Sequence, residues 1–195
     1  YNYFLSLGFT PAAAAGITGN IAIESGFNPM VQGGGFGLVQ WMEDFGNPEI
    51  IRGIIRDEGL GQYIGAPYGN PGFNVGDYPA EDYDKLLKIQ LDYLMSQDGT
   101  GPYKDKAKAD HFSDKLEGVD DPLEAAEIFL TTFERAVNGS SPILYYAPYK
   151  GQLYQMASER RDAAEAVFGR MGGASASATP KRAKSFPMKR NSPTE

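Results

Sequence analysis

The sequence predicts a mainly α-helical domain, with room for a small β-hairpin near a cluster of glycines. Several stretches of the chain carry apolar residues at the spacing of one helix face. Two of these stretches begin with a capping residue followed by proline, the usual start of a helix. By contrast, the glycine-rich stretch 32–37 and the Gly/Pro/Tyr-rich stretch 59–79 sustain neither a helical nor a strand period.

The first strong helix signal follows the nine N-terminal residues. Thr10 can accept a hydrogen bond as N-cap, and Pro11 has the fixed backbone that suits the first turn. Apart from two glycines, no helix breaker occurs before Gly26, which suits a helix C-terminus. We therefore expect a helix over residues 12–25.

Further helices are expected downstream. One covers 81–97, a second starts at the capping box Asp121–Glu124 and ends near Arg135, and a third is opened by Pro148. Residues 103–116 give a weaker signal for a short helix. The apolar positions that should face the core are Leu87, Leu91 and Leu94 in the first, Ala126, Phe129, Leu130 and Phe133 in the second, and Leu153, Met156 and Val167 in the third.

Composition divides the chain into a domain, residues 1–171, and a tail, residues 172–195. The tail is rich in Gly, Ala, Ser and Pro and carries a net charge of +4. Because the whole chain has a net charge of −7, the net charge of the domain is −11. Such a tail is typical of a flexible basic linker, with a docking or nucleic-acid-binding segment as the alternative. The acidic domain should repel polyanions, so we expect no nucleic-acid binding by the globular part.

Several classes of chemistry are excluded or weakened by residue counts. The chain has no Cys, which removes disulfides, thiolate metal sites and a Cys nucleophile. The single histidine, His111, lies in a charged stretch and fits a surface position better than a catalytic one. We expect no metal, no cofactor and no membrane span, since no apolar run is long enough for one.

Glu24 is the candidate catalytic residue. On the expected helix it shares a face with Ile17 and Ile21 and lies in the last turn, where the helix dipole is negative. Apolar surroundings and the dipole both disfavour a charged carboxylate, and a general acid must hold its proton. The alternative is a surface glutamate, or one bound by backbone donors of the following turn.

The segment Gly37–Trp41 follows the glycine cluster and is the candidate substrate-binding segment. The Gln40 amide can read sugar hydroxyls, and the indole of Trp41 can cover the apolar face of a pyranose. The competing interpretation makes Trp41 a core anchor and Gln40 an ordinary loop residue.

These motifs resemble those of known cell-wall enzymes. Glu24-Ser25 followed by Gly37-Leu38-Val39-Gln40 is similar to the Glu-Ser and Gly-Leu-Met-Gln motifs of soluble lytic transglycosylases and goose-type lysozymes. The stretches 19–29, 37–41, 90–94 and 133–136 resemble the phage tail lysozyme family in order and spacing. The resemblance covers roughly Asn2 to Phe168.

The resemblance implies a two-lobed, lysozyme-like fold with a glycan-binding cleft. It implies a muramidase that cleaves the β-1,4 bond between N-acetylmuramic acid and N-acetylglucosamine, with Glu24 as proton donor. Ser25 would orient Glu24 or contact substrate, Gln40 would hold the glycan or a water, and Trp41 would contact sugar. Glu134 has the family's late Phe-Glu position and is more consistent with a buried structural role than with catalysis.

A second catalytic carboxylate is left open. Glu43 and Asp44 follow Trp41, and ordinary loop charges are the preferred interpretation for them. The sequence departs from the family there, where an Arg-containing helix start is usual, and the long Gly/Tyr-rich stretch 59–79 also looks inserted. Lytic transglycosylases need one acid/base residue because the sugar's own 6-hydroxyl acts as nucleophile, so both hydrolysis and transglycosylation are open.

The expected partners are bacterial peptidoglycan and other proteins of a phage virion or tail. The expected place of action is the cell wall or periplasm, reached from the virion. A lysozyme-like module that binds peptidoglycan without cutting it, or a purely structural virion piece, is the alternative.

Overall fold

The fold is described from a computed structural model. The structure describes residues 1–32, 35–42, 48–64, 74–99, 101–102, 111–133 and 150–172, with side chains of 150–157 and 172 excluded. The described part of the chain is mainly helical, as the sequence predicts. No helix within it is long and apolar enough to cross a bilayer.

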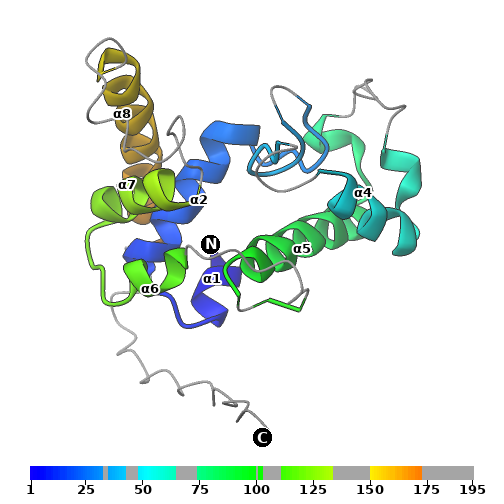
Figure 1. Ribbon diagram of the computed structural model, residues 1–195, viewed down its shortest axis with the longest axis horizontal. Helices are drawn as coiled ribbons and strands as arrows, with labels where there is room; N and C mark the ends of the chain where they lie inside the picture. The colour runs from blue at the N-terminus through cyan, green and yellow to red at the C-terminus, as the bar shows by residue number, and fades with distance from the viewer. Residues whose placement is uncertain are drawn as a thin grey trace, which may run out of the picture.

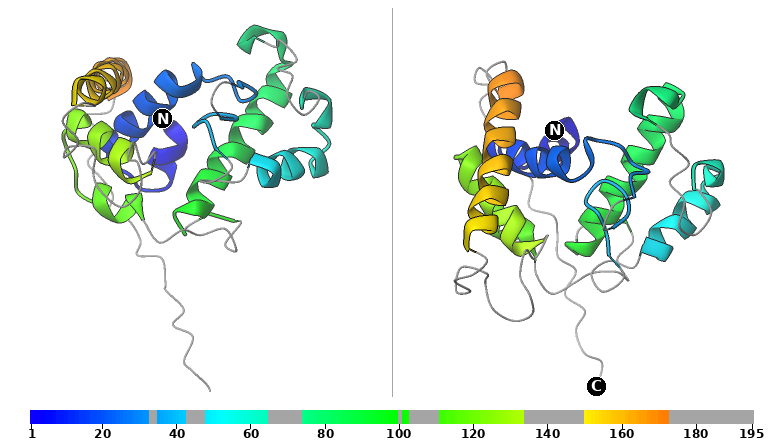
Figure 2. Two further views of the ribbon diagram at one scale, coloured as in Figure 1. Left: turned by 45° about the horizontal axis from the view of Figure 1, so that its top comes forward. Right: turned by 90° about the horizontal axis from the view of Figure 1, so that it is seen from above.

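The helices form two groups joined by α2 and the segment that follows it (Figure 1). The elements are α1 (Asn2–Ser6), α2 (Pro11–Ser25), α4 (Pro48–Asp57), α5 (Ala80–Gln97), α6 (Phe112–Leu116), α7 (Pro122–Thr132) and α8 (Lys150–Val167), with the 3-10 helices η1 (Gly61–Tyr63) and η2 (Val75–Asp77) and the π-helical segment η6 (Phe168–Gly172). One group holds α6, α7 and α8 against α2, and the other holds α4 and α5 (Figures 1 and 2).

The start and end of α2 confirm the sequence prediction. Thr10 has an extended backbone, and its hydroxyl accepts a hydrogen bond from the Ala13 amide at 3.0 Å. Gly26 adopts the left-handed conformation at the C-terminus, with φ 56°. Both ends are thus determined by residues next to the helix in the sequence.

Two glycines of α2 allow other helices to come unusually close. A Cβ on Gly16 would lie 2.5 Å from the Cβ of Ala125 in α7. A Cβ on Gly19 would lie 2.6 Å from the backbone nitrogen of Ala164 in α8. Because α2 meets α7 and α8 with its backbone, it is buried along most of its length, and its sequence shows little amphipathic pattern.

The other predicted helices are found with modest changes. α5 covers the expected stretch, α7 ends at Thr132 rather than near Arg135, and α8 is described from Lys150, with Pro148 outside the described residues. Asp121 caps α7 by accepting a hydrogen bond from the Leu123 amide at 2.9 Å. The weak prediction over 103–116 is found as α6 alone, and its first eight residues lie outside the described part of the chain.

Two helices, α1 and α4, were not predicted from the sequence. α1 is a five-residue helix whose Phe4 is buried. α4 buries Ile51 and Ile55, four residues apart, and starts at Pro48. The spacing of these isoleucines is a signal that could have identified α4.

The glycine region holds isolated bridges rather than a named strand among the described residues. Phe36 pairs with Gln32 and with Trp41. The amides of Phe36 and Trp41 donate to each other's carbonyls at 3.0 and 2.9 Å, which closes the turn 37–40. This turn lies where the sequence allowed a small hairpin.

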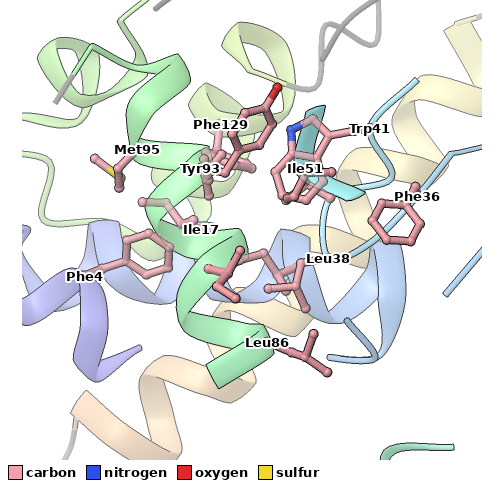
Figure 3. Packing of buried hydrophobic residues seen from close by; sticks show 14 of the residues in the cluster. Phe4, Ile17, Phe36, Leu38, Trp41, Ile51, Leu86, Tyr93, Met95 and Phe129 are labelled. Atoms are coloured by element: carbon pink, nitrogen blue, oxygen red, sulfur yellow. The ribbon is translucent and has the colours of Figure 1, made fainter. Parts of the chain in front are cut away.

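One hydrophobic core connects the two groups of helices (Figure 3). Ile17 of α2, Ile51 of α4 and Leu86, Tyr93 and Met95 of α5 belong to it. The turn after the glycines also contributes, because Phe36, Leu38 and Trp41 are buried in the same core. The segment after α2 is therefore fixed to α5 by its own side chains.

Candidate active site

Glu24 lies in the last turn of α2, and its carboxylate forms an ion pair with Arg160 of α8. Nη2 of Arg160 donates to Oε1 of Glu24. The Arg160 side chain is 4% exposed and that of Glu24 is 21% exposed, so the pair is mostly covered while part of the carboxylate reaches solvent. Among the described residues, the structure gives Glu24 no second polar partner.

The ion pair corrects the apolar surroundings expected for Glu24. Ile17 and Ile21 are buried as predicted. The carboxylate, however, meets a guanidinium that is 136 residues away in the sequence. The surroundings of the Glu24 carboxylate are therefore partly cationic rather than only apolar. No local spacing could have indicated Arg160, because the contact depends on how α8 packs.

Ser25 and Asn20 use their side chains within the helix bundle. The Ser25 hydroxyl donates to the carbonyl of Ile21 at 3.0 Å, so it bonds its own helix rather than Glu24. The amide of Asn20, one turn before Glu24, donates to the carbonyls of Gly16 at 2.8 Å and Ala126 at 3.1 Å. Asn20 thereby ties α2 to α7 directly below the candidate residue.

Directly after α2 the chain turns sharply, and two tyrosines hold the turn. The Tyr78 hydroxyl donates to Oδ1 of Asn28 at 3.0 Å, and the Tyr83 hydroxyl donates to the carbonyl of Phe27 at 2.9 Å. Burial raises the pKa of Tyr78 to about 12 and also raises that of Tyr83. Both hydroxyls therefore keep their protons and remain donors at neutral pH.

Phe27 is an exposed aromatic residue that sequence reasoning did not single out. Its backbone has φ 64°, a left-handed conformation that is rare for a bulky residue, and its side chain is 37% exposed. Strained residues of this kind gather at functional sites. Phe27 lies three residues after Glu24, on the turn that Tyr78 and Tyr83 hold.

The Gln40 amide is used inside the glycine turn. Nε2 of Gln40 donates to the carbonyl of Gly37 at 3.0 Å, and Oε1 accepts from the Gly35 amide at 3.2 Å. Gln40 itself has φ 51°. A Cβ on Gly35 would lie 2.1 Å from the carbonyl oxygen of Gln40, so only glycine fits there.

Trp41 is in the core, 3% exposed. Its Nε1 donates to Oε1 of Gln97 at 2.7 Å, and its ring meets that of Tyr93 edge to face at 5.4 Å (Figure 3). A second glutamine of α5, Gln90, accepts from the Leu38 amide at 2.8 Å and donates to the carbonyl of Pro29. Sugar contact through the indole face has no support in this arrangement, and the core-anchor interpretation fits it.

Three candidate acids lie outside the described residues: Glu43, Asp44 and Glu134. His111 is exposed, and its Nδ1 lies 2.6 Å from the carbonyl oxygen of Asp98. Within the ranges that the structure describes, no cluster of three or more His, Cys, Asp or Glu side chains could hold a metal ion.

Comparison with known families gives a match that covers most of the chain. The family model described as phage tail lysozyme matches residues 1–171 of the 195-residue chain. The chain belongs to the phage tail lysozyme family. A comparison with curated proteins found no match. Family membership indicates a lysozyme-like function related to the cell wall, and Glu24, Arg160 and the turn 37–40 all lie within the matched part.

Proposed function

We propose that this domain is a muramidase that cleaves the β-1,4 bond between N-acetylmuramic acid and N-acetylglucosamine, with Glu24 as general acid. The observation that supports the proposal is the unequal hydrogen bonding of the two Glu24 carboxylate oxygens, in a chain that belongs to the phage tail lysozyme family. Arg160 holds Oε1, while Oε2 has no partner among the described residues and part of the side chain reaches solvent. Oε2 is therefore the oxygen from which a proton can pass to a glycosidic oxygen.

The substrate is proposed to lie along the end of α2 and the turn that follows it, in a cleft between the two helix groups. Phe27 offers an exposed aromatic face near Glu24, and aromatic faces cover the apolar faces of pyranose rings. Gln40 and Trp41 are proposed to shape this region by holding the glycine turn against α5. Ser25 contributes by fixing the last turn of α2.

A lysozyme-like module that binds peptidoglycan without cutting it is the competing function. One observation favours it: the Glu24 carboxylate is held in an ion pair by a buried guanidinium, an arrangement that can also serve a purely structural role. The acidic body gains no electrostatic attraction to an anionic wall. We propose that the domain reaches the wall as part of a phage virion or tail, attached to other virion proteins, and opens it locally.

Product analysis on purified peptidoglycan tests the muramidase proposal. The released fragments are identified by mass spectrometry, and each should carry a muramic acid residue at the end formed at C1. A reducing end would assign hydrolysis, whereas a 1,6-anhydro end would assign transglycosylation. Binding without release of fragments, or fragments whose reducing end is N-acetylglucosamine, would contradict the proposal.

A further inference from the structure

We propose that Arg160 is a positioning residue for Glu24, which makes α8 part of the active site. This inference rests on the proposed function and adds a residue that lies 136 positions from Glu24 in the sequence. Three observations support the inference: the ion pair itself, the burial of Arg160 and the crossing of α8 over α2.

The guanidinium of Arg160 restricts where the Glu24 carboxylate can lie. A glutamate side chain at a helix end has several accessible rotamers. Arg160 is 4% exposed, and a buried guanidinium is costly unless it is hydrogen-bonded to a counter-charge. The hydrogen bond to Arg160 therefore favours the Glu24 rotamers that reach the guanidinium, and contact through Oε1 keeps Oε2 available.

The crossing of α2 and α8 brings the two side chains within reach of each other. Gly19 and Ala164 touch backbone to backbone at the crossing. Glu24 lies about 7.5 Å further along α2, and Arg160 about 6 Å from Ala164 along α8, at the rise of an α-helix. Because Gly19 has no Cβ, the helix axes come close enough for the side chains to meet. The close approach at Gly19 therefore helps to bring Arg160 within reach of Glu24.

The proposed step assigns Arg160 a role as the bond breaks. The proton moves from Oε2 of Glu24 to the glycosidic oxygen, and the bond from that oxygen to C1 breaks with its electron pair kept by the oxygen. C1 becomes an oxocarbenium ion and is captured by water or by the sugar's 6-hydroxyl, whose proton returns to Glu24. Negative charge develops on Glu24 during the first step, and Arg160 stabilises it.

Steady-state kinetics on peptidoglycan test this role. Arg160→Met removes the guanidinium and its charge and keeps an unbranched side chain, so we expect kcat to fall at least about tenfold with KM nearly unchanged. Arg160→Lys keeps the charge and should recover part of kcat. Arg161→Met is the matched control, since Arg161 pairs with exposed Glu127 at 3.2 Å and should leave kcat unchanged. Equal kcat in wild type and Arg160→Met, or an equal loss in Arg161→Met, would overturn the inference.

A thermal-unfolding cycle tests the pair without using activity. The midpoint Tm is measured for wild type, Glu24→Gln, Arg160→Met and the double variant. If the two side chains are coupled, the double variant should lose less Tm than the sum of the single losses. Additive losses would overturn the inference. If wild type cuts no peptidoglycan but the cycle shows coupling, the muramidase proposal fails while the pair stands.

Discussion

Trp41 and Gln97 join the glycine turn to α5 through one buried hydrogen bond. Nε1 of Trp41 donates to Oε1 of Gln97 at 2.7 Å, and Gln97 is 2% exposed. The indole N–H of Trp41 and the amide oxygen of Gln97 are hydrogen-bonded to each other in the core, so removal of either side chain would leave a buried polar atom without this partner. The pair explains why the single tryptophan of the chain lies inside the domain.

The burial of Trp41 predicts weak collisional quenching of its fluorescence. Trp41 is the only tryptophan, so the emission of the whole protein reports on this position. Acrylamide should quench the native protein several-fold less than the urea-unfolded chain, because the indole is covered. Equal quenching of the two states would contradict the core assignment and restore a surface role in sugar binding.

The glycine turn predicts that Gly37→Ala destabilises the domain. Gly37 has φ 76°, and a Cβ there would lie 2.4 Å from Oε1 of Gln90. We expect a loss of about 1–3 kcal/mol in the free energy of unfolding, measured with urea. Gly53→Ala in α4 is the control, since its Cβ would meet nothing within 4 Å. The control should stabilise by up to about 1 kcal/mol, and equal effects at both positions would contradict the account.

The exposed ring of Phe27 predicts a change in substrate affinity. Phe27→Ala should raise KM about threefold or more, because it removes an apolar contact to sugar and leaves Glu24 in place. Leu7→Ala is the control, since Leu7 has the same exposed fraction of 37% and lies in the turn after α1. An unchanged KM in Phe27→Ala, or the same rise in the control, would remove Phe27 from the substrate site.

The burial of Asp98 predicts that the difference in stability between wild type and an Asp98→Asn variant depends on pH. Asp98 is 1% exposed, and burial raises the pKa of its carboxyl above the ordinary value of 3.8, against the opposing effect of hydrogen bonds from Ser113. The folded state therefore binds the proton more tightly than the unfolded state, and this contribution to stability is lost as the pH rises through the folded-state pKa.

Asp98→Asn lacks this titration but can still accept from the Ser113 amide. The stability of the variant relative to wild type should therefore increase from acid to neutral pH. Urea unfolding at several pH values measures it. A difference that is constant with pH, or that decreases as the pH rises, would contradict the burial of a charged Asp98.

The sequence predicts those structural features that are caused by residues next to them in the chain. The bounds of α2 follow from Thr10, Pro11 and Gly26, which act on their own helix, so the sequence was sufficient. Glu24 could be placed at the helix end for the same reason, although its role as acid stays a proposal. α4 received no assignment from the sequence, although the spacing of Ile51 and Ile55 fits one helix face.

Contacts between distant segments could not be predicted. Arg160 meets Glu24 because Gly19 admits α8, a consequence of tertiary packing. Gln90 and Gln97 fall on a predicted helix, yet their buried amides serve backbone and indole groups of a loop about fifty residues earlier in the chain. Polar residues in such positions look like surface residues in the sequence.

The most direct test of the central claim is the rate at which Glu24→Gln clears a suspension of purified peptidoglycan. Glutamine keeps the size of the side chain but cannot donate the proton, so the rate should fall at least about a hundredfold while the variant remains folded. Glu127→Gln is the control, because Glu127 also pairs with an arginine of α8 but on an exposed surface, and it should clear the suspension at the wild-type rate. A wild-type rate in Glu24→Gln would contradict the account.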